Sequence, residues 1–177
     1  MYPLSHLAII REVTTSMFQA EGYTGNKQEN YELLLKQLDA LLDGEPNVLA
    51  NLCNAAALLN QFLTEVNWVG FYLYDKEQSV LTLGPFQGLP ACTRIPTGKG
   101  VCGTAVSERR TMRVADVQAF PGHIACDAAS RSEVVIPIIK GEEIYGVLDI
   151  DSPITDRFDE VDEKYLEEFV VRVTKYL

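Results

Sequence analysis

Two amphipathic helices that follow one another directly are the feature of this sequence that most constrains its fold. The first is predicted from Asn26, an N-cap with Glu29 as its capping-box partner, to a break at Gly44, and its leucines recur at helical spacing. The second is predicted over about 46–65. Its apolar face is predicted to consist of Leu49, Leu52, Cys53, Ala56, Leu59 and Leu63. A helical hairpin of this kind must bury its apolar faces against another layer.

The rest of the chain predicts that this layer is an antiparallel sheet. Strand-forming residues are predicted at 68–74, 80–86, 92–95, 111–114, 133–139 and 143–151, with a short helix entered near 98–106 and a long loop at 115–130. Asp159 is predicted to cap a closing helix. This order is typical of an α+β domain with its helices gathered on one face of the sheet. We expect one domain over 26–177, preceded by an N-terminal extension at 1–25.

Charge and hydropathy exclude several classes of partner. The formal net charge is −10, whereas nucleic-acid and anionic-lipid surfaces require basic stripes. No apolar run approaches the roughly 18 residues that span a bilayer. The opening segment lacks the basic start, apolar centre and cleavage site of a signal peptide. We therefore expect a cytoplasmic protein without nucleic-acid or membrane partners, in a compartment where thiols stay reduced.

Four cysteines in a reducing compartment serve as packing residues, metal ligands or reactive thiols. Cys53 lies on the predicted apolar face of the second helix, so we interpret it as packing. Cys92, Cys102 and Cys126 lie in loops or at element ends beside small residues, and their spacings of ten and twenty-four residues fit no metal-binding pair. These three thiols predict a redox site without a metal. The alternative is that they are three unrelated loop thiols.

Reactivity requires a group that lowers the pKa of the thiol. Cys102 lies near the predicted N-terminus of a short helix, where unpaired amides and the helix dipole favour an anion. Cys126 has His123 and Arg131 as nearby basic residues. Taken by itself, the helix-terminus argument favours Cys102 as the reactive thiol.

Three acids are predicted to converge near these thiols. Strand alternation places Asp149 and Asp151 on one face, and Glu133 begins the neighbouring strand of the same hairpin. Like charges at this spacing raise one pKa, which suits a proton donor. The alternative for each of these acids is a solvated position at a strand end. The spacing of the three carboxylates does not match the ligand patterns of calcium or magnesium sites. Trp68 and Tyr72 are predicted on one face of their strand. There they serve either as core packing or as an aromatic wall against a small ligand.

At these residues the sequence resembles the free methionine-(R)-sulfoxide reductases, a catalytic branch of the GAF domains, over about 28–177. The blocks that carry the resemblance are Asn67-Trp68-Val69-Gly70-Phe71-Tyr72, Leu83-Gly84-Pro85-Phe86-Gln87-Gly88, and residues 98–106, 122–130 and 146–152. The resemblance implies a six-stranded antiparallel GAF sheet, a homodimer, and reduction of free methionine R-sulfoxide to methionine. It implies no organic cofactor and no metal.

The resemblance also implies roles for individual residues. By position, Cys126 is similar to the nucleophile, Cys92 to the main resolving cysteine and Cys102 to a third family cysteine. Trp68 and Tyr72 resemble the pocket for the substrate methyl group. Glu133, Asp149 and Asp151 resemble the acids that hold the amino group and polarise the sulfoxide. Thioredoxin is the implied reductant of the resulting disulfide. The alternatives are a GAF sensor that binds a small molecule or nucleotide, and a redox-sensing thiol protein without a substrate.

Overall fold

A single sheet of six antiparallel strands organises the structure, a computed structural model that describes residues 22–122 and 128–177. The strand order is β3-β2-β1-β6-β5-β4. The strands are β1 (Trp68–Asp75), β2 (Val80–Gly88), β3 (Arg94–Pro96), β4 (Met112–Val114), β5 (Ser132–Lys140) and β6 (Glu143–Ser152). The helices are α1 (Lys27–Leu42), α2 (Val48–Phe62), α3 (Gly100–Glu108) and α4 (Glu160–Thr174), with a 3₁₀ turn at Val117–Ala119. The predicted α+β class is confirmed.

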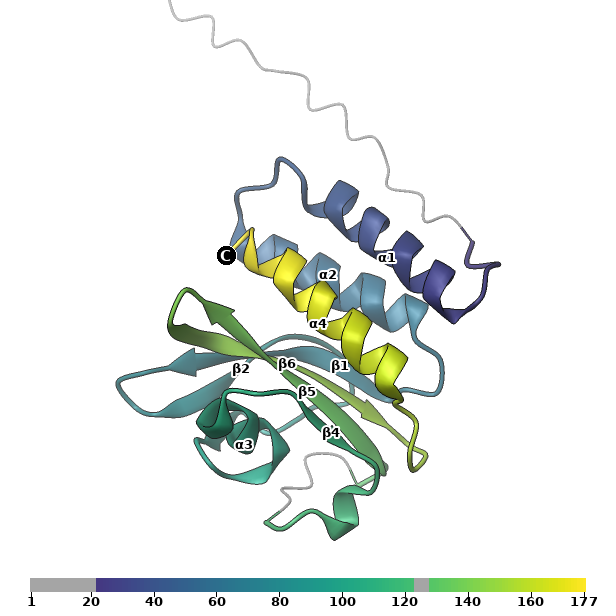
Figure 1. The fold of residues 1–177 in the computed structure, drawn as a ribbon. Coiled ribbons are helices and arrows are strands. Elements are labelled where there is room, and N and C mark those ends of the chain that lie inside the picture. Colours follow the sequence, from purple (N-terminus) through teal and green to yellow (C-terminus); the bar gives the residue numbers. More distant parts are fainter. Residues whose placement is uncertain (1–21, 123–127) are drawn as a thin grey trace, which may run out of the picture.

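The helices are divided between the two faces of the sheet. In Figure 1, α1, α2 and α4 lie together on one side and the short α3 lies on the other. The long helices bury a large apolar cluster with the sheet residues Val69, Phe71, Leu148 and Ile150. The prediction that helices gather on one face therefore holds for the three long helices, which form the main core.

Helix boundaries follow the predicted capping residues. The side chain of Asn26 accepts from the Glu29 amide at 3.0 Å, and the Glu29 carboxylate accepts from the Asn26 amide at 2.9 Å. Asp159 caps α4 in the same way, with Asp162 as its reciprocal partner. Each capping box satisfies amides that have no partner within the helix.

Cys53 does not have the buried position that its spacing predicted. Both Cys53 and Leu49 are exposed, Leu49 to 61%. The buried face of α2 is formed by Asn51, Leu52, Ala55, Ala56, Leu58 and Leu59. Each residue advances about 100° around a helix, so Cys53 lies on the far side of Leu52 from the centre of this face. The packing interpretation of Cys53 is wrong, because the predicted apolar face was extended too far on one side.

A buried carboxylate joins α1 to α4. Asp162 is fully buried, and the Tyr31 hydroxyl donates to its Oδ1 at 2.7 Å. Lys27 Nζ and Arg157 Nη1 donate to its Oδ2 at 2.7 and 3.2 Å. Every charge in this network has a partner, which is the condition under which a buried ion pair is tolerated.

Asp162→Ala is expected to lower the free energy of unfolding by about 3 kcal/mol, because it leaves the buried Tyr31 hydroxyl and Arg157 without their acceptor. Urea denaturation followed by circular dichroism measures this loss. Glu143→Ala is the matched control, since Glu143 and Lys76 form an exposed pair at 2.7 Å. Equal losses in the two variants would contradict the structural role of Asp162.

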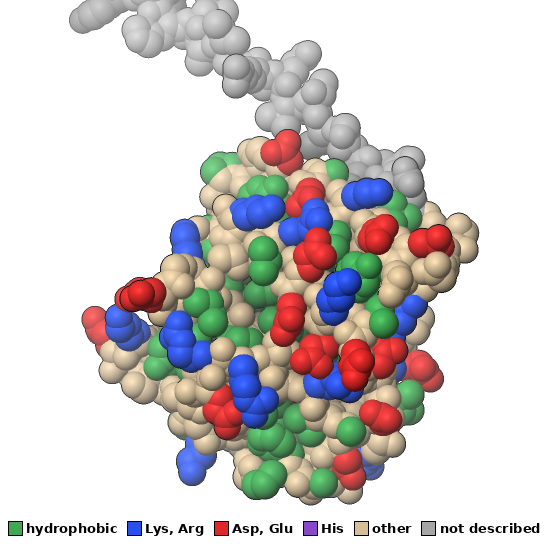
Figure 2. All heavy atoms as spheres, viewed as in Figure 1, with side chains coloured by type: hydrophobic (Ala, Val, Ile, Leu, Met, Phe, Trp, Pro, Cys, Tyr) green, Lys and Arg blue, Asp and Glu red, His purple; other side chains and the backbone are tan. Residues whose placement is uncertain are grey.

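Charged side chains of both signs are interspersed on the face of the molecule in Figure 2. The chain has 25 acidic and 15 basic residues. On this face, the basic side chains do not form the continuous stripe typical of a nucleic-acid surface. None of the described helices combines the length and the apolar character needed to cross a membrane.

Candidate active site

The face of the sheet opposite the long helices is covered by α3 and carries the predicted site residues. Trp68 and Tyr72 of β1 and Val147 of β6 pack there against Val101 and Cys102 of α3. Strand pairing sets Asp149 opposite Gly70 and Asp151 opposite Trp68. Because paired residues share a face, both aspartates lie on the α3 side while Leu148 and Ile150 face the long helices. The predicted alternation along this strand is confirmed.

An aromatic wall lines one side of this face. The Trp68 ring stacks on Tyr72 and Phe86, with centroid separations of 5.7 and 5.2 Å. Trp68 Nε1 donates to the Leu89 carbonyl at 3.1 Å, which fixes the orientation of the indole. Gly70 leaves the necessary space, because a Cβ there would lie 2.6 Å from Trp68 Cη2 and 2.4 Å from Phe86 Cβ. A glycine in the strand therefore positions the wall.

Gly70→Ala is expected to lower the free energy of unfolding by about 1–3 kcal/mol, because the added methyl group must displace the indole or Phe86. Trp68 is the only tryptophan in the chain, so its fluorescence reports the displacement directly. Gly22→Ala is the control, since a Cβ at that position meets no atom within 4 Å. An unchanged emission spectrum and an unchanged urea midpoint would show that the wall does not depend on Gly70.

A buried cluster of one thiol and two acids lies on the same face. Cys102, Glu133 and Asp149 are only 4%, 5% and 6% exposed. The Cys102 thiol donates to Glu133 Oε1 at 3.9 Å, and one polar atom from each of the three residues lies within 4.8 Å of the others. Asp151, which is half-buried, pairs with Glu133 across the β5–β6 ladder. The structure brings the three predicted acids together, and a solvated strand end is the wrong interpretation for Glu133 and Asp149.

Burial controls the protonation of these acids. It raises the pKa of Asp149 to about 6, although hydrogen bonds with Cys102 and Glu133 lower that pKa. Burial also raises the pKa of Glu133 well above its usual value, and the charges of Asp149 and Asp151 add to this shift. Burial and the neighbouring aspartates thus favour the protonated form of Glu133. Among the described residues, Asp149 Oδ1 has no hydrogen-bond partner, and neither Glu133 nor Asp149 forms a salt bridge.

Cys102 behaves in the opposite way to the helix-terminus prediction. It is the third residue of α3, as expected, but burial raises the pKa of its thiol well above the usual value. The nearby Asp149, Glu133 and Asp151 carboxylates raise this pKa further. The partial charge at a helix N-terminus is small beside these effects. The predicted lowering of the Cys102 thiol pKa by the helix terminus is therefore wrong, because burial and the three acids keep the thiol neutral.

The other two site cysteines differ in how far the structure describes them. Cys92 is disulfide-bonded, is half-buried and borders the apolar cluster under α3. Cys92 precedes β3, which begins at Arg94, two residues later than the strand predicted at 92–95. Cys126 and its neighbour His123 lie outside the described residues. Phe120, shortly before the residues that are not described, packs against the cluster that Cys92 borders.

Phe86 and Gly70 belong to the candidate site but were not predicted as site residues from the sequence. They are paired across β1 and β2, and Phe86 completes the stack on Trp68. A glycine between aromatic residues within a strand was the available signal, because it indicates a side chain crossing close to the backbone.

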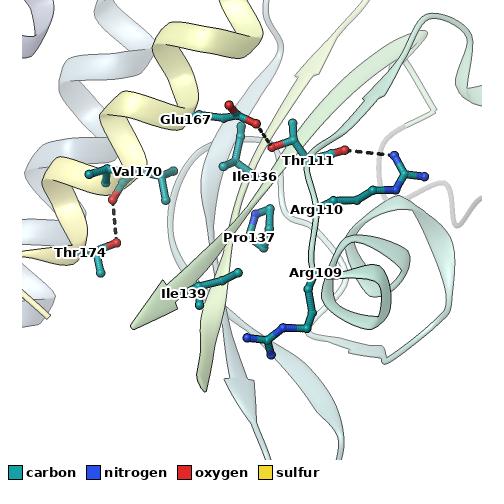
Figure 3. A pocket seen from close by; sticks show the side chains of 10 residues that line it. Arg109, Arg110, Thr111, Ile136, Pro137, Ile139, Glu167, Val170 and Thr174 are labelled. Carbon is teal, nitrogen blue, oxygen red and sulfur yellow. Dashed lines mark hydrogen bonds between the residues drawn. The ribbon is translucent and has the colours of Figure 1, made fainter. Parts of the chain in front are cut away.

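A separate cavity of about 450 Å³ lies between α4 and β5 (Figure 3). Its walls include Ile136, Pro137 and Val170, with Arg109 and Arg110 at one side. None of the predicted site residues that the structure describes lines it. The described candidate residues lie instead on the α3 face of the sheet.

Comparison with known proteins agrees with this arrangement. A family model described as the GAF domain matches residues 38–177. The free methionine-R-sulfoxide reductase of Escherichia coli (strain K12) is 51% identical over 152 residues, 86% of this chain and 91% of that protein.

Solved structures show the same likeness in three dimensions. The structure of fRMsr of Staphylococcus aureus in its reduced form is 59% identical, with a TM-score of 0.80, and the match covers 84% of this chain and 95% of that chain. Free methionine-R-sulfoxide reductase from Neisseria meningitidis in complex with its substrate is 42% identical, with a TM-score of 0.87 and coverage of 90% and 95%. This chain belongs to the GAF domain family and, within it, to the free methionine-R-sulfoxide reductases, which are oxidoreductases.

Proposed function

We propose that this chain reduces free methionine R-sulfoxide to methionine at the α3 face of the sheet, by thiol chemistry and without a metal or organic cofactor. The observation that carries the proposal is the pair of buried acids, Glu133 and Asp149, beside the aromatic wall of Trp68 and Tyr72. The relatives named as free methionine-R-sulfoxide reductases, one of them in complex with its substrate, support this substrate.

The chemistry of the pocket fits a free amino acid. A buried ammonium group requires a carboxylate partner, and Asp149 and Asp151 supply carboxylates at one end of the site. The apolar methyl end of the substrate packs against Trp68 and Tyr72. Methionine within a peptide lacks this ammonium group. The pocket therefore selects the free amino acid over peptide-bound methionine sulfoxide.

The proposed reaction begins at Cys126, with a proton from Glu133. The Cys126 thiolate attacks the sulfoxide while Glu133 protonates the departing oxygen. The oxygen passes to Cys126 as a sulfenic acid, and methionine leaves with its sulfur reduced by two electrons. The raised pKa of Glu133 supports its role as the donor, because burial and the neighbouring aspartates favour the protonated carboxyl group. Glu133 is a better candidate than Asp151, which is less buried.

Cys92 then resolves the sulfenic acid. Its thiol condenses with the Cys126 sulfenic acid, releases water and forms an intramolecular disulfide, which the thioredoxin dithiol reduces. The position of Cys92 at the border of the site, and its bonding in a disulfide, support this role. Cys102, held as a neutral thiol against Glu133, is the third site cysteine and positions the proton donor.

Three further proposals come from the family resemblance and the composition. We propose a homodimer in the cytoplasm, and one GAF domain over 26–177 with residues 1–25 as an extension. Size-exclusion chromatography with light scattering tests the dimer, and truncation after residue 25 tests the domain boundary.

A stereospecific assay tests the proposed function. Purified protein is incubated with free R-, free S- and peptide-bound methionine sulfoxide, with dithiothreitol or with thioredoxin and its reductase. We expect consumption of the free R epimer only, with both reductants. Cys53→Ser is the control, because the exposed Cys53 is remote from the site and its loss leaves the rate unchanged. If free R-sulfoxide is not consumed with either reductant, the enzyme proposal fails, and a ligand-binding or redox-sensing GAF protein is the remaining hypothesis.

A further inference from the structure

We propose that Cys102, Glu133 and Asp149 form a binding site for a thiophilic divalent cation of the Zn²⁺ class. The bound cation occupies the acidic end of the substrate pocket and excludes substrate. The exclusion rests on the proposed function, whereas binding of the cation does not.

The spacing of the three side chains suits such a cation. One candidate ligand atom from each residue lies within 4.8 Å of the other two, and Cys102 Sγ lies 3.9 Å from Glu133 Oε1. Tetrahedral zinc, with a bond of about 2.3 Å to sulfur and about 2.0 Å to oxygen, holds its ligand atoms roughly 3.5 Å apart. Side-chain rotations that move the ligand atoms by about one ångström or less therefore bring all three within bonding distance of one cation.

A second, independent observation points to a cation in this place. Asp149 is 6% exposed, and its Oδ1 has no hydrogen-bond partner in the part of the chain that the structure describes. Neither Asp149 nor Glu133 takes part in a salt bridge among the described residues. A buried carboxylate without a counter-charge is costly, so a positive charge entering the pocket is strongly favoured. The substrate ammonium group and a metal ion meet this requirement equally, and only one of them fits at a time.

The donor set selects among metals. A thiolate ligand favours Zn²⁺ and similar soft or borderline ions, whereas Mg²⁺ and Ca²⁺ take oxygen ligands. Binding releases the thiol proton of Cys102 and the carboxyl proton of Glu133 to solvent, and it leaves a fourth position for water. The three ligands come from α3, β5 and β6. Apolar residues of these elements pack together in one cluster, which holds the ligands in place. This arrangement provides a preformed site on regular secondary structure.

The test is a titration of the full-length protein, reduced with a phosphine, with Co²⁺ as the spectroscopic probe. We expect one equivalent to bind and to produce a thiolate-to-cobalt charge-transfer band in the near ultraviolet, with Zn²⁺ abolishing the band. Cys102→Ser is expected to lose the band, and Asp149→Asn to keep it while binding Co²⁺ at least tenfold more weakly. Cys53→Ser is the thiol control and keeps both the band and the affinity.

The outcomes separate the metal site from the proposed function. A band that persists in Cys102→Ser overturns the site, as does an Asp149→Asn variant with unchanged affinity. If Cys102→Ser does not fold, Glu133→Gln replaces it, with an expected tenfold loss of affinity. Saturating free methionine is expected to weaken Zn²⁺ binding at least tenfold, and unchanged binding overturns the exclusion. A protein that binds Co²⁺ through Cys102 but reduces no sulfoxide retains the metal site and loses the proposed function.

Discussion

Cys126→Ser is expected to lower kcat/KM for free methionine R-sulfoxide by at least about 10³-fold, whereas Cys102→Ser lowers it by about tenfold or less. A serine hydroxyl is not ionised at neutral pH and does not attack sulfur, so the first step of the cycle is lost. Cys102 is held as a neutral thiol by burial and by the adjacent acids, which makes it a poor nucleophile. Steady-state turnover with dithiothreitol measures both effects.

Cys92→Ser separates the first step from the second. This variant is expected to turn over with dithiothreitol, which reduces the Cys126 sulfenic acid directly, and to lose turnover with thioredoxin, which needs the disulfide. Full activity of Cys126→Ser together with an inactive Cys102→Ser would reverse the assignment of the nucleophile. It would also show that substrate binding shifts the pKa of Cys102 far from its value in the unliganded pocket.

Asp149→Asn is expected to lower kcat/KM by about 10²-fold while making the unliganded protein more stable at alkaline pH. The loss of activity follows from removing a buried counter-charge of the substrate ammonium group, which typically costs about 2–5 kcal/mol. The gain in stability follows from removing a carboxylate that is buried without a cation among the described residues. Function and stability therefore respond to this substitution in opposite directions.

The pH dependence of this gain has a defined sign. Burial raises the pKa of Asp149 from 3.8 to about 6, so between these values the folded protein binds a proton that the unfolded chain does not. Stability therefore falls as pH rises through this window, by up to about 3 kcal/mol from this one group. Urea unfolding of the unliganded proteins is expected to show equal stability at pH 3.5 and a more stable Asp149→Asn variant at pH 8.

Ser152→Ala is a control at the same strand that leaves the acids intact, since the Ser152 hydroxyl donates to the Glu65 carbonyl away from the cluster. It is expected to change stability by the same amount at both pH values. An Asp149→Asn variant that is destabilised equally at pH 3.5 and pH 8 would show that this carboxylate has no raised pKa in the folded protein.

Local patterns predicted much of the fold and part of the site. The capping residues Asn26 and Asp159 predicted helix starts correctly, because a cap acts through its own neighbouring amides. Alternation along β6 placed Asp149 and Asp151 on one face, because the period of a strand is fixed by its geometry. The aromatic pair of Trp68 and Tyr72 followed from the same rule.

The errors arose where tertiary surroundings decide the outcome. Spacing placed Cys53 on an apolar face, but where that face ends depends on which residues of α2 the sheet covers. The helix terminus predicted a low pKa for Cys102, but the acids that oppose it come from β5 and β6, far away in the sequence. The burial of Glu133 and the identity of Phe86 as the side chain that crosses Gly70 could not be predicted from local sequence, because both depend on packing across strands.

The register of the β5–β6 hairpin places the acids and the core residues of β6 on opposite faces at once. Its register pairs Glu133 with Asp151, and a slip of one residue would turn the two aspartates of β6 toward the long helices. Charged groups would then enter an apolar layer while Leu148 and Ile150 lost their burial, and the chain could not close. Any molecule that reaches the native state has therefore already assembled its acids.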